Sequence, residues 1–236
     1  MNGKTGLNLL IAFVLLLAAG LLAWAGLHWS DANAQLLVSL CILAIVSEAF
    51  DFAPFAGCRI SMSIALILTA AVFSGLPGIA AVSLVTAAAD HAWHRKPLYK
   101  SAFNAGVLVI AGGAFVGVLE AFSPVYESGD WLAMLGPVTV GGVAVFAVNS
   151  GLVALAMALA TGTDSIQVWS RNFRWVLPHY VLISVLALFL ATAYDRWELG
   201  GLALLLGPLA MSWLALKQFT DRSSDSSQIA PGPSQP

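Results

Sequence analysis

The stretch LNLLIAFVLLLAAGLLAWAGLHW occupies residues 7–29 and contains no aspartate, glutamate, lysine or arginine. A helix needs about 20 consecutive apolar residues to cross the hydrocarbon core of a bilayer, which is about 30 Å thick. The stretch is longer than the apolar part of a secretion signal, and its end lacks a cleavage site of small residues. It therefore predicts an uncleaved first transmembrane helix.

Similar apolar runs recur along the chain, and they predict an all-α polytopic bundle of about eight transmembrane helices. The seven further runs lie at residues 34–52, 60–74, 78–94, 102–122, 131–160, 176–194 and 199–218. The runs at 60–74 and 78–94 are short, and Gly75-Leu76-Pro77-Gly78 connects them. We expect these two to be short helices inside the bundle, or one of them to be re-entrant.

The composition excludes a water-soluble domain and a nucleic-acid-binding protein. Of the 236 residues, 59% are hydrophobic and 9% are charged, and the mean hydropathy is +0.87. Soluble globular proteins carry about 25% charged residues. The net charge is −2 and the basic residues are scattered, whereas binding to phosphates needs a clustered basic surface. The lipid bilayer is the partner that this composition predicts.

The distribution of basic residues predicts the orientation, because lysine and arginine accumulate in cytoplasmic loops. With Lys4 on the cytoplasmic side and eight crossings, nine of the ten basic residues fall on that side and only Arg196 falls outside. Both termini are therefore expected in the cytoplasm, in a multi-pass protein of a bacterial inner membrane. Residues 1–220 form the predicted membrane domain. Residues 221–236 are polar and rich in serine and proline, which predicts a disordered cytoplasmic tail.

Ionisable groups inside membrane spans cost about 2.5 to 3.5 kcal/mol on insertion scales and so are candidates for function. Such groups and buried amides predict a ligand-binding or gating site made of Glu48, Asp90, His91, Asn104 and Asn149. The first four lie near the same cytoplasmic depth in the predicted topology. In the alternative interpretation they are helix-end residues, with Asp90 paired to Arg95 or Arg59. His179 is one more polar position, on the predicted helix 176–194.

No enzyme, metal or cofactor site is predicted. The pattern Asp90-His91-x-x-His94 places two histidines on one helix face, but it is not an HExxH motif and offers no third ligand. The chain contains no GxSxG, P-loop or GxGxxG motif that would indicate a known catalytic or nucleotide-binding site. A membrane-embedded enzyme that uses Asp90, His91 and His94 remains a third interpretation.

The segment before the predicted helix 176–194 combines aromatic and basic residues. Residues 164–169 predict a short amphipathic helix at the membrane interface. The segment carries Trp169, Arg171, Asn172 and Trp175. These residues either anchor the segment at the headgroups or form a coupling element that contacts a cytoplasmic partner. Both interpretations remain open at this stage.

Several short motifs resemble the multi-spanning N-terminal region of bacterial HD-GYP phosphohydrolases and GGDEF diguanylate cyclases, over about residues 35–220. These motifs are Ser47-Glu48, Ile60-Ser61-Met62-Ser63-Ile64-Ala65, Ala89-Asp90, Arg95-Lys96-Pro97-Leu98-Tyr99-Lys100-x-x-Phe103-Asn104, Val148-Asn149 and Val168-Trp169-x-x-Asn172-x-x-Trp175-x-x-Pro178-x-Tyr180. In that family the membrane region senses a signal and passes it to a cytoplasmic cyclic-di-GMP domain. No HD, GYP or GGDEF motif occurs in this chain.

The resemblance implies a stand-alone, non-enzymatic sensory module that binds a ligand in the membrane and acts on a cytoplasmic signalling partner. The short, glycine-rich helices also look like the substrate-binding subunit of energy-coupling-factor vitamin transporters, which work with further transporter subunits. Those subunits usually have six helices, whereas eight are predicted here. Sensing is the leading prediction, and uptake of a vitamin-like solute is the alternative.

Overall fold

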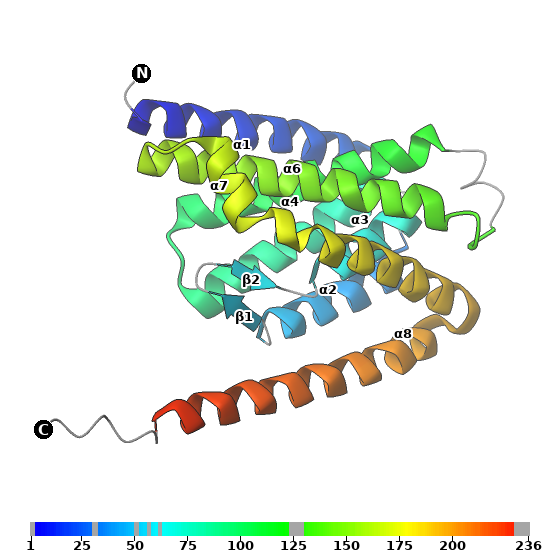
Figure 1. Ribbon diagram of the computed structural model, residues 1–236. Helices are drawn as coiled ribbons and strands as arrows, with labels where there is room; N and C mark the ends of the chain where they lie inside the picture. The colour runs from blue at the N-terminus through cyan, green and yellow to red at the C-terminus, as the bar shows by residue number, and fades with distance from the viewer. Residues whose placement is uncertain are drawn as a thin grey trace, which may run out of the picture. The chain divides into compact units, whose positions relative to one another are not determined.

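The computed structural model of the protein describes residues 3–29, 33–49, 52–55, 58–60, 63–122 and 130–228, and most of these are helical. The helices are α1 (Gly3–Leu27), α2 (Ala34–Ala49), α3 (Ser63–His94), α4 (Leu98–Ala121), α6 (Leu135–Thr161), α7 (Ser165–Asn172) and α8 (Leu177–Gln228), with a 3-10 turn at Arg174–Val176. Figure 1 shows them as coiled ribbons.

Five helical stretches in the described residues are long and apolar enough to cross a membrane. Four are α1, α3, α4 and α6, and the fifth is Arg174–Ala203, which includes the first part of α8. The helix Ala34–Glu48 is apolar but shorter. The chain is thus a helical protein of the multi-pass membrane type, as its sequence predicts.

The predicted helices 60–74 and 78–94 are one helical segment interrupted by a single residue. Gly75 alone leaves the helical conformation, with φ 52° and ψ −137°, and glycine adopts positive φ without steric cost. A Cβ atom on Gly78 would meet the carbonyl oxygen of Ala70. Residues eight apart in a straight helix are separated by about 12 Å. The chain of α3 therefore reverses direction at Gly75, and the four-residue connection predicted at 75–78 is wrong.

A similar interruption divides α8, where Glu198 has φ 49° and ψ −133°. It falls between the predicted helices 176–194 and 199–218. The helix continues to Gln228, so the tail predicted from residue 221 begins inside a helix, and the first proline after it is Pro231. Residues 229–236 of that tail lie outside the described residues. The chain divides into two compact units, Met1–Ala191 and Thr192–Pro236.

Two short strands, which the sequence reading did not predict, separate α2 from α3. β1 (Phe52–Phe55) and β2 (Cys58–Ile60) pair in antiparallel fashion, with Phe52 opposite Ile60 and Phe55 opposite Cys58. Pro54 disfavours continuation of α2, and the aromatic residues around it favour strands. The predicted helix 34–52 accordingly ends at Ala49, and the predicted helix 60–74 begins at Ser63.

In the first unit, α4 lies at the centre and packs against α1, α3 and α6, while α2 packs against α3. Figure 1 shows α1 and α6 side by side, and a cluster formed by Val14, Phe103 and Val107 joins α1 to α4. Several helices approach one another closely at glycines. A Cβ atom would lie 2.8 Å from Val14 at Gly106, 2.6 Å from Ile79 at Gly112 and 2.6 Å from Phe115 at Gly141.

One end of the first unit gathers several basic residues, and we call it the basic end. The left of Figure 1 shows this end, which comprises the start of α1, the strands β1 and β2, the α3–α4 connection and the α6–α7 connection. A Cβ atom on Gly3 would lie 2.9 Å from the carbonyl oxygen of Leu159, which places the start of α1 beside the end of α6. The basic residues in or next to these segments are Lys4, Arg59, Arg95, Lys96, Lys100, Arg171 and Arg174. At the opposite end of the unit α4 ends and α6 begins, and Glu120 lies in the last turn of α4.

Candidate functional site

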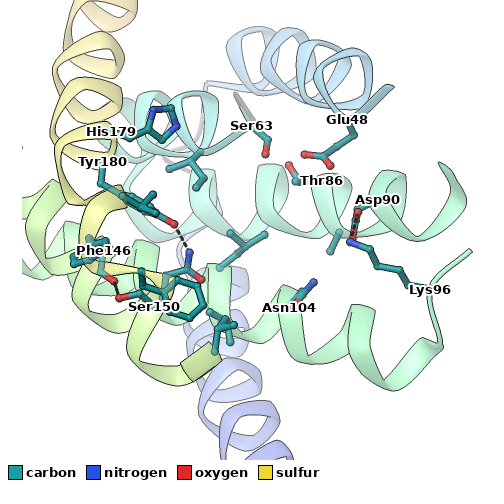
Figure 2. Close-up of a pocket in the computed structure, with 18 of the residues that line it drawn as sticks. Glu48, Ser63, Thr86, Asp90, Lys96, Asn104, Phe146, Ser150, His179 and Tyr180 are labelled. Atoms are coloured by element: carbon teal, nitrogen blue, oxygen red, sulfur yellow. Dashed lines mark hydrogen bonds and ion pairs between the residues drawn. The ribbon is translucent and has the colours of Figure 1, made fainter. Parts of the chain in front are cut away.

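The first unit contains a cavity of about 300 Å³ near the basic end, with walls from α2, α3, α4, α6 and the start of α8. This volume is at the lower end of the range for small-molecule sites. Four of the five predicted ligand-binding residues line it: Asn149 and, as labelled in Figure 2, Glu48, Asp90 and Asn104. Its other lining residues are Ser63, Ile64, Thr86, Ala87, Lys96, Val107, Leu108, Phe146, Ser150, Val153, Met157, Phe173, Val176, His179 and Tyr180.

One wall carries a carboxylate and two hydroxyl groups. Glu48, in the last turn of the apolar helix α2, is only 5% exposed. Ser63 is the first residue of α3 and Thr86 lies in its second arm, and both are buried. Figure 2 shows the two hydroxyls and the Glu48 carboxylate on the same wall. This wall is therefore polar and acidic within an otherwise apolar bundle.

An ion pair lies along the same side of the cavity. Lys96 Nζ donates to both carboxylate oxygens of Asp90 at 2.7 Å. His94 Nδ1 lies 2.9 Å from one of these oxygens. The partner of Asp90 is thus Lys96 rather than Arg95, because α3 ends at His94 and Arg95 adopts a φ of 48°, which turns the chain back.

The structure places His91 outside the cavity lining. Its Nδ1 atom lies 3.1 Å from the Ser101 hydroxyl, so it links the end of α3 to the start of α4. Asp90, His91 and His94 therefore do not converge on one point. Within the described part of the chain, no three histidine, cysteine, aspartate or glutamate side chains come close enough to hold a metal ion.

The wall opposite Glu48 is formed by amide and aromatic groups of α6 and α8. Asn149 Nδ2 donates a hydrogen bond to Tyr180 Oη. The rings of Phe146 and Tyr180 meet edge to face, with their centroids 5.4 Å apart, an arrangement that favours aromatic packing. The cavity thus has an acidic wall on one side and an aromatic wall on the other.

Two buried polar atoms in the cavity lining have no hydrogen-bond partner among the residues that the structure describes. They are the hydroxyl oxygen of Thr86 and Nε2 of His179. Leaving a buried polar group without a hydrogen bond costs about 1 to 3 kcal/mol, so natural proteins seldom do so. Because both atoms border the same cavity, a polar molecule inside it would satisfy them.

Several of these lining residues were not predicted from the sequence, although their spacing of four residues places them on the same helix face as other lining residues. Thr86 and Asp90 are four residues apart on α3 and so share a helix face, as do Phe146 and Ser150 on α6. Hydroxyl residues are common in membrane helices, so Thr86 did not stand out from its alanine-rich surroundings. Tyr180 entered the sequence reading only through the family motif.

The predicted amphipathic helix at 164–169 is confirmed as α7, and it is attached to the cavity wall. Asp164 caps it by accepting a hydrogen bond from the Gln167 backbone at 2.9 Å. The Trp169 indole donates to the Ser150 hydroxyl at 2.8 Å, and Ser150 donates to the Phe146 carbonyl at 2.6 Å. Trp169 therefore connects α7 to a residue that lines the cavity.

The other predicted coupling residues lie on the outer surface. Arg171 and Asn172 are exposed, and Asn172 Nδ2 donates to the Val168 carbonyl within α7 at 2.8 Å. Trp175 is 43% exposed. The four residues thus divide into one inward anchor, Trp169, and three surface residues.

Comparisons of the chain with protein-family models, with curated proteins and with solved structures found no match.

Proposed function

We propose that this protein is a non-enzymatic, multi-pass membrane protein that binds a small amphipathic molecule in the cavity and communicates its occupancy through α7. The observation that carries the proposal is a pair of buried atoms on the walls of one cavity, Thr86 Oγ1 and His179 Nε2, for which the described part of the chain offers no hydrogen-bond partner. A bound molecule with polar groups at two points would remove the cost of burying both atoms.

The link between Ser150 and Trp169 supports a sensory role. Ser150 lines the cavity and accepts the indole hydrogen bond that holds α7 in place. A ligand that displaces the Ser150 side chain would therefore change the position of α7. The exposed Arg171 and Trp175 would present that change to a cytoplasmic signalling partner, as in the membrane regions of the cyclic-di-GMP proteins that the motifs resemble.

The proposed orientation has eight crossings, with both termini in the cytoplasm of a bacterial cell and the protein in the inner membrane. The gathering of lysine and arginine at the basic end supports this orientation, because such residues accumulate on the cytoplasmic side. Reporter fusions after Ala121 and after Thr161 test it. Active periplasmic alkaline phosphatase is expected only from the first fusion, and activity from the second would overturn the orientation.

Native mass spectrometry of the full chain tests whether the cavity binds a molecule. Ala87 lines the cavity, so Ala87→Leu reduces its volume and should abolish a retained small-molecule mass. Ala19 is exposed on α1, so Ala19→Leu adds the same side chain elsewhere and should retain the mass. An adduct of equal occupancy in both variants would contradict the proposal.

Transport of a vitamin-like solute is the second candidate function. The observation that favours it is the location of the cavity among helices that are long and apolar enough to span a membrane. Co-purification discriminates between the two functions. Recovery of an ATP-binding-cassette subunit would favour transport, whereas recovery of a cyclic-di-GMP enzyme that is lost in Arg171→Ala would favour sensing.

A further inference from the structure

We infer that the cavity selects a small organic cation, with its ammonium group at the acidic wall and its apolar body against the aromatic wall. This inference rests on the proposed function, in which the cavity binds a small molecule. It adds the chemical class of that molecule, which follows from the charges and hydrogen-bonding groups of the lining.

The charged groups of the lining favour a cation over an anion. They comprise two carboxylates, Glu48 and Asp90, and one ammonium group, Lys96. Lys96 donates to both oxygens of Asp90, so it is already engaged by a carboxylate. Among the described lining residues, an anionic ligand would therefore meet two carboxylates and a single ammonium group, which already binds Asp90. Such repulsion is strong in an apolar interior, where charges are poorly screened.

The geometry around Glu48 suits an ammonium group. An ionised carboxylate offers about four lone-pair positions, so Glu48 can accept hydrogen bonds from a ligand in addition to its contact within the protein. Thr86 Oγ1 lies on the same wall, is buried and has no partner within the described ranges. An ammonium group has three N–H donors and no acceptor. It can therefore donate to the Glu48 carboxylate and to the Thr86 hydroxyl at once.

The remaining walls define the other half of the ligand. Val107, Leu108 and Phe146 supply apolar surface, and Tyr180 adds a second ring. Aromatic rings also attract cations through their electron-rich faces. The volume of about 300 Å³ fits a compact molecule with an aromatic or short aliphatic body. His179 Nε2 provides one further polar contact, for a substituent at the end of the ligand opposite its ammonium group.

Calorimetry on the full chain in lipid nanodiscs tests this class with three probes of similar shape. The probes are 2-phenylethylamine, which is cationic, 2-phenylethanol, which is neutral, and 3-phenylpropionate, which is anionic. The amine should bind at least about tenfold more tightly than either of the others. Equal or tighter binding of the alcohol or the acid would overturn the inference, although binding in the cavity would then still stand.

Matched variants locate the selectivity. Glu48→Gln keeps the size of the side chain and should bring the amine within about threefold of the alcohol. Glu120→Gln alters an exposed carboxylate near the far end of α4 and should leave the selectivity unchanged. Thr86→Val, which adds no buried polar group, should weaken amine binding more than alcohol binding. Unchanged amine selectivity in Glu48→Gln would refute the inference, as would failure of the wild-type protein to bind any probe.

The outcomes also separate this inference from the proposed function. If no probe binds but the retained mass is still lost in Ala87→Leu, the cation class is wrong and the cavity is still a binding site. If that mass is equally present in Ala87→Leu and Ala19→Leu, the proposed function is wrong as well.

Discussion

The indole nitrogen of Trp169 donates a hydrogen bond of 2.8 Å to the hydroxyl of Ser150, and this bond joins the surface helix α7 to the inner helix α6. Ser150 is 3% exposed, so the bond is shielded from solvent at one end. The Trp169 ring also lies 5.9 Å from the Phe146 ring, centroid to centroid. α7 thus has a specific attachment to α6.

Ser150→Ala should lower the free energy of unfolding by about 1 to 3 kcal/mol, because it leaves the indole N–H without its acceptor. Detergent titration of the purified protein, followed by circular dichroism, measures the change. Ser170→Ala is the matched control, since the Ser170 hydroxyl bonds the Gln167 carbonyl within exposed α7. Equal effects of the two substitutions would contradict the importance of the Trp169 bond.

Gly142→Ala should destabilise the protein by about 1 to 3 kcal/mol, the usual cost of overpacking. A Cβ atom at Gly142 would meet the Ser184 side chain, with 2.7 Å to its Cβ atom, where α6 crosses α8. The double variant Gly142→Ala/Ser184→Gly should recover part of the loss, as seen in thermal unfolding. Gly136→Ala, which has no neighbour within 4 Å, serves as the control and should be close to neutral.

Gly75→Ala should cost about 1 to 3 kcal/mol, since alanine would be held in a conformation that side chains disfavour. The position has open space around it, so any loss would arise from the backbone and not from a clash. Gly20→Ala in α1, which also has no neighbour within 4 Å, should be neutral or slightly stabilising. A Gly75→Ala protein as stable as Gly20→Ala would exclude a reversal at this residue.

The Asp90–Lys96 pair should show a coupling energy of about 0.5 to 3 kcal/mol in a double-mutant cycle. Lys96→Met and Asp90→Asn each break the pair, whose side chains are 27% and 12% exposed, respectively. The double variant should lose less stability than the sum of the two single variants. Lys100→Met, an exposed lysine two residues into α4, controls for the loss of one positive charge. Strict additivity in the cycle would mean that the pair contributes nothing.

The apolar runs of the sequence predict most helix positions because a long, uncharged segment has few alternatives to a helix in lipid. They do not predict that one glycine is enough to separate the predicted helices 60–74 and 78–94, since the apolar pattern of the two helices is the same whatever the length of the turn between them. The strands at 52–60 were missed for a different reason. Their aromatic residues continue the apolar run of α2, and only Pro54 signals a change.

The candidate site was predictable wherever a charge or an amide interrupts an apolar helix, as at Glu48, Asp90, Asn104 and Asn149. Such groups are costly in lipid and therefore face the protein interior. His91 is also an ionisable residue in an apolar helix, but it lies on a part of α3 that faces Ser101. Depth along a helix can be read from the sequence, whereas the direction of a side chain around the helix depends on which neighbours pack against it.

The reversal at Gly75 also bears on how the chain is inserted during synthesis. The same cavity is lined by Ser63, the first residue of α3, and by Asp90, which is close to its last residue. Both ends of α3 therefore lie on one side of the bundle. The α3 hairpin thus adds no net crossing, whether its arms traverse the bilayer fully or turn back within it. The sidedness of α4 and of every later segment is therefore independent of how deeply this hairpin enters the lipid.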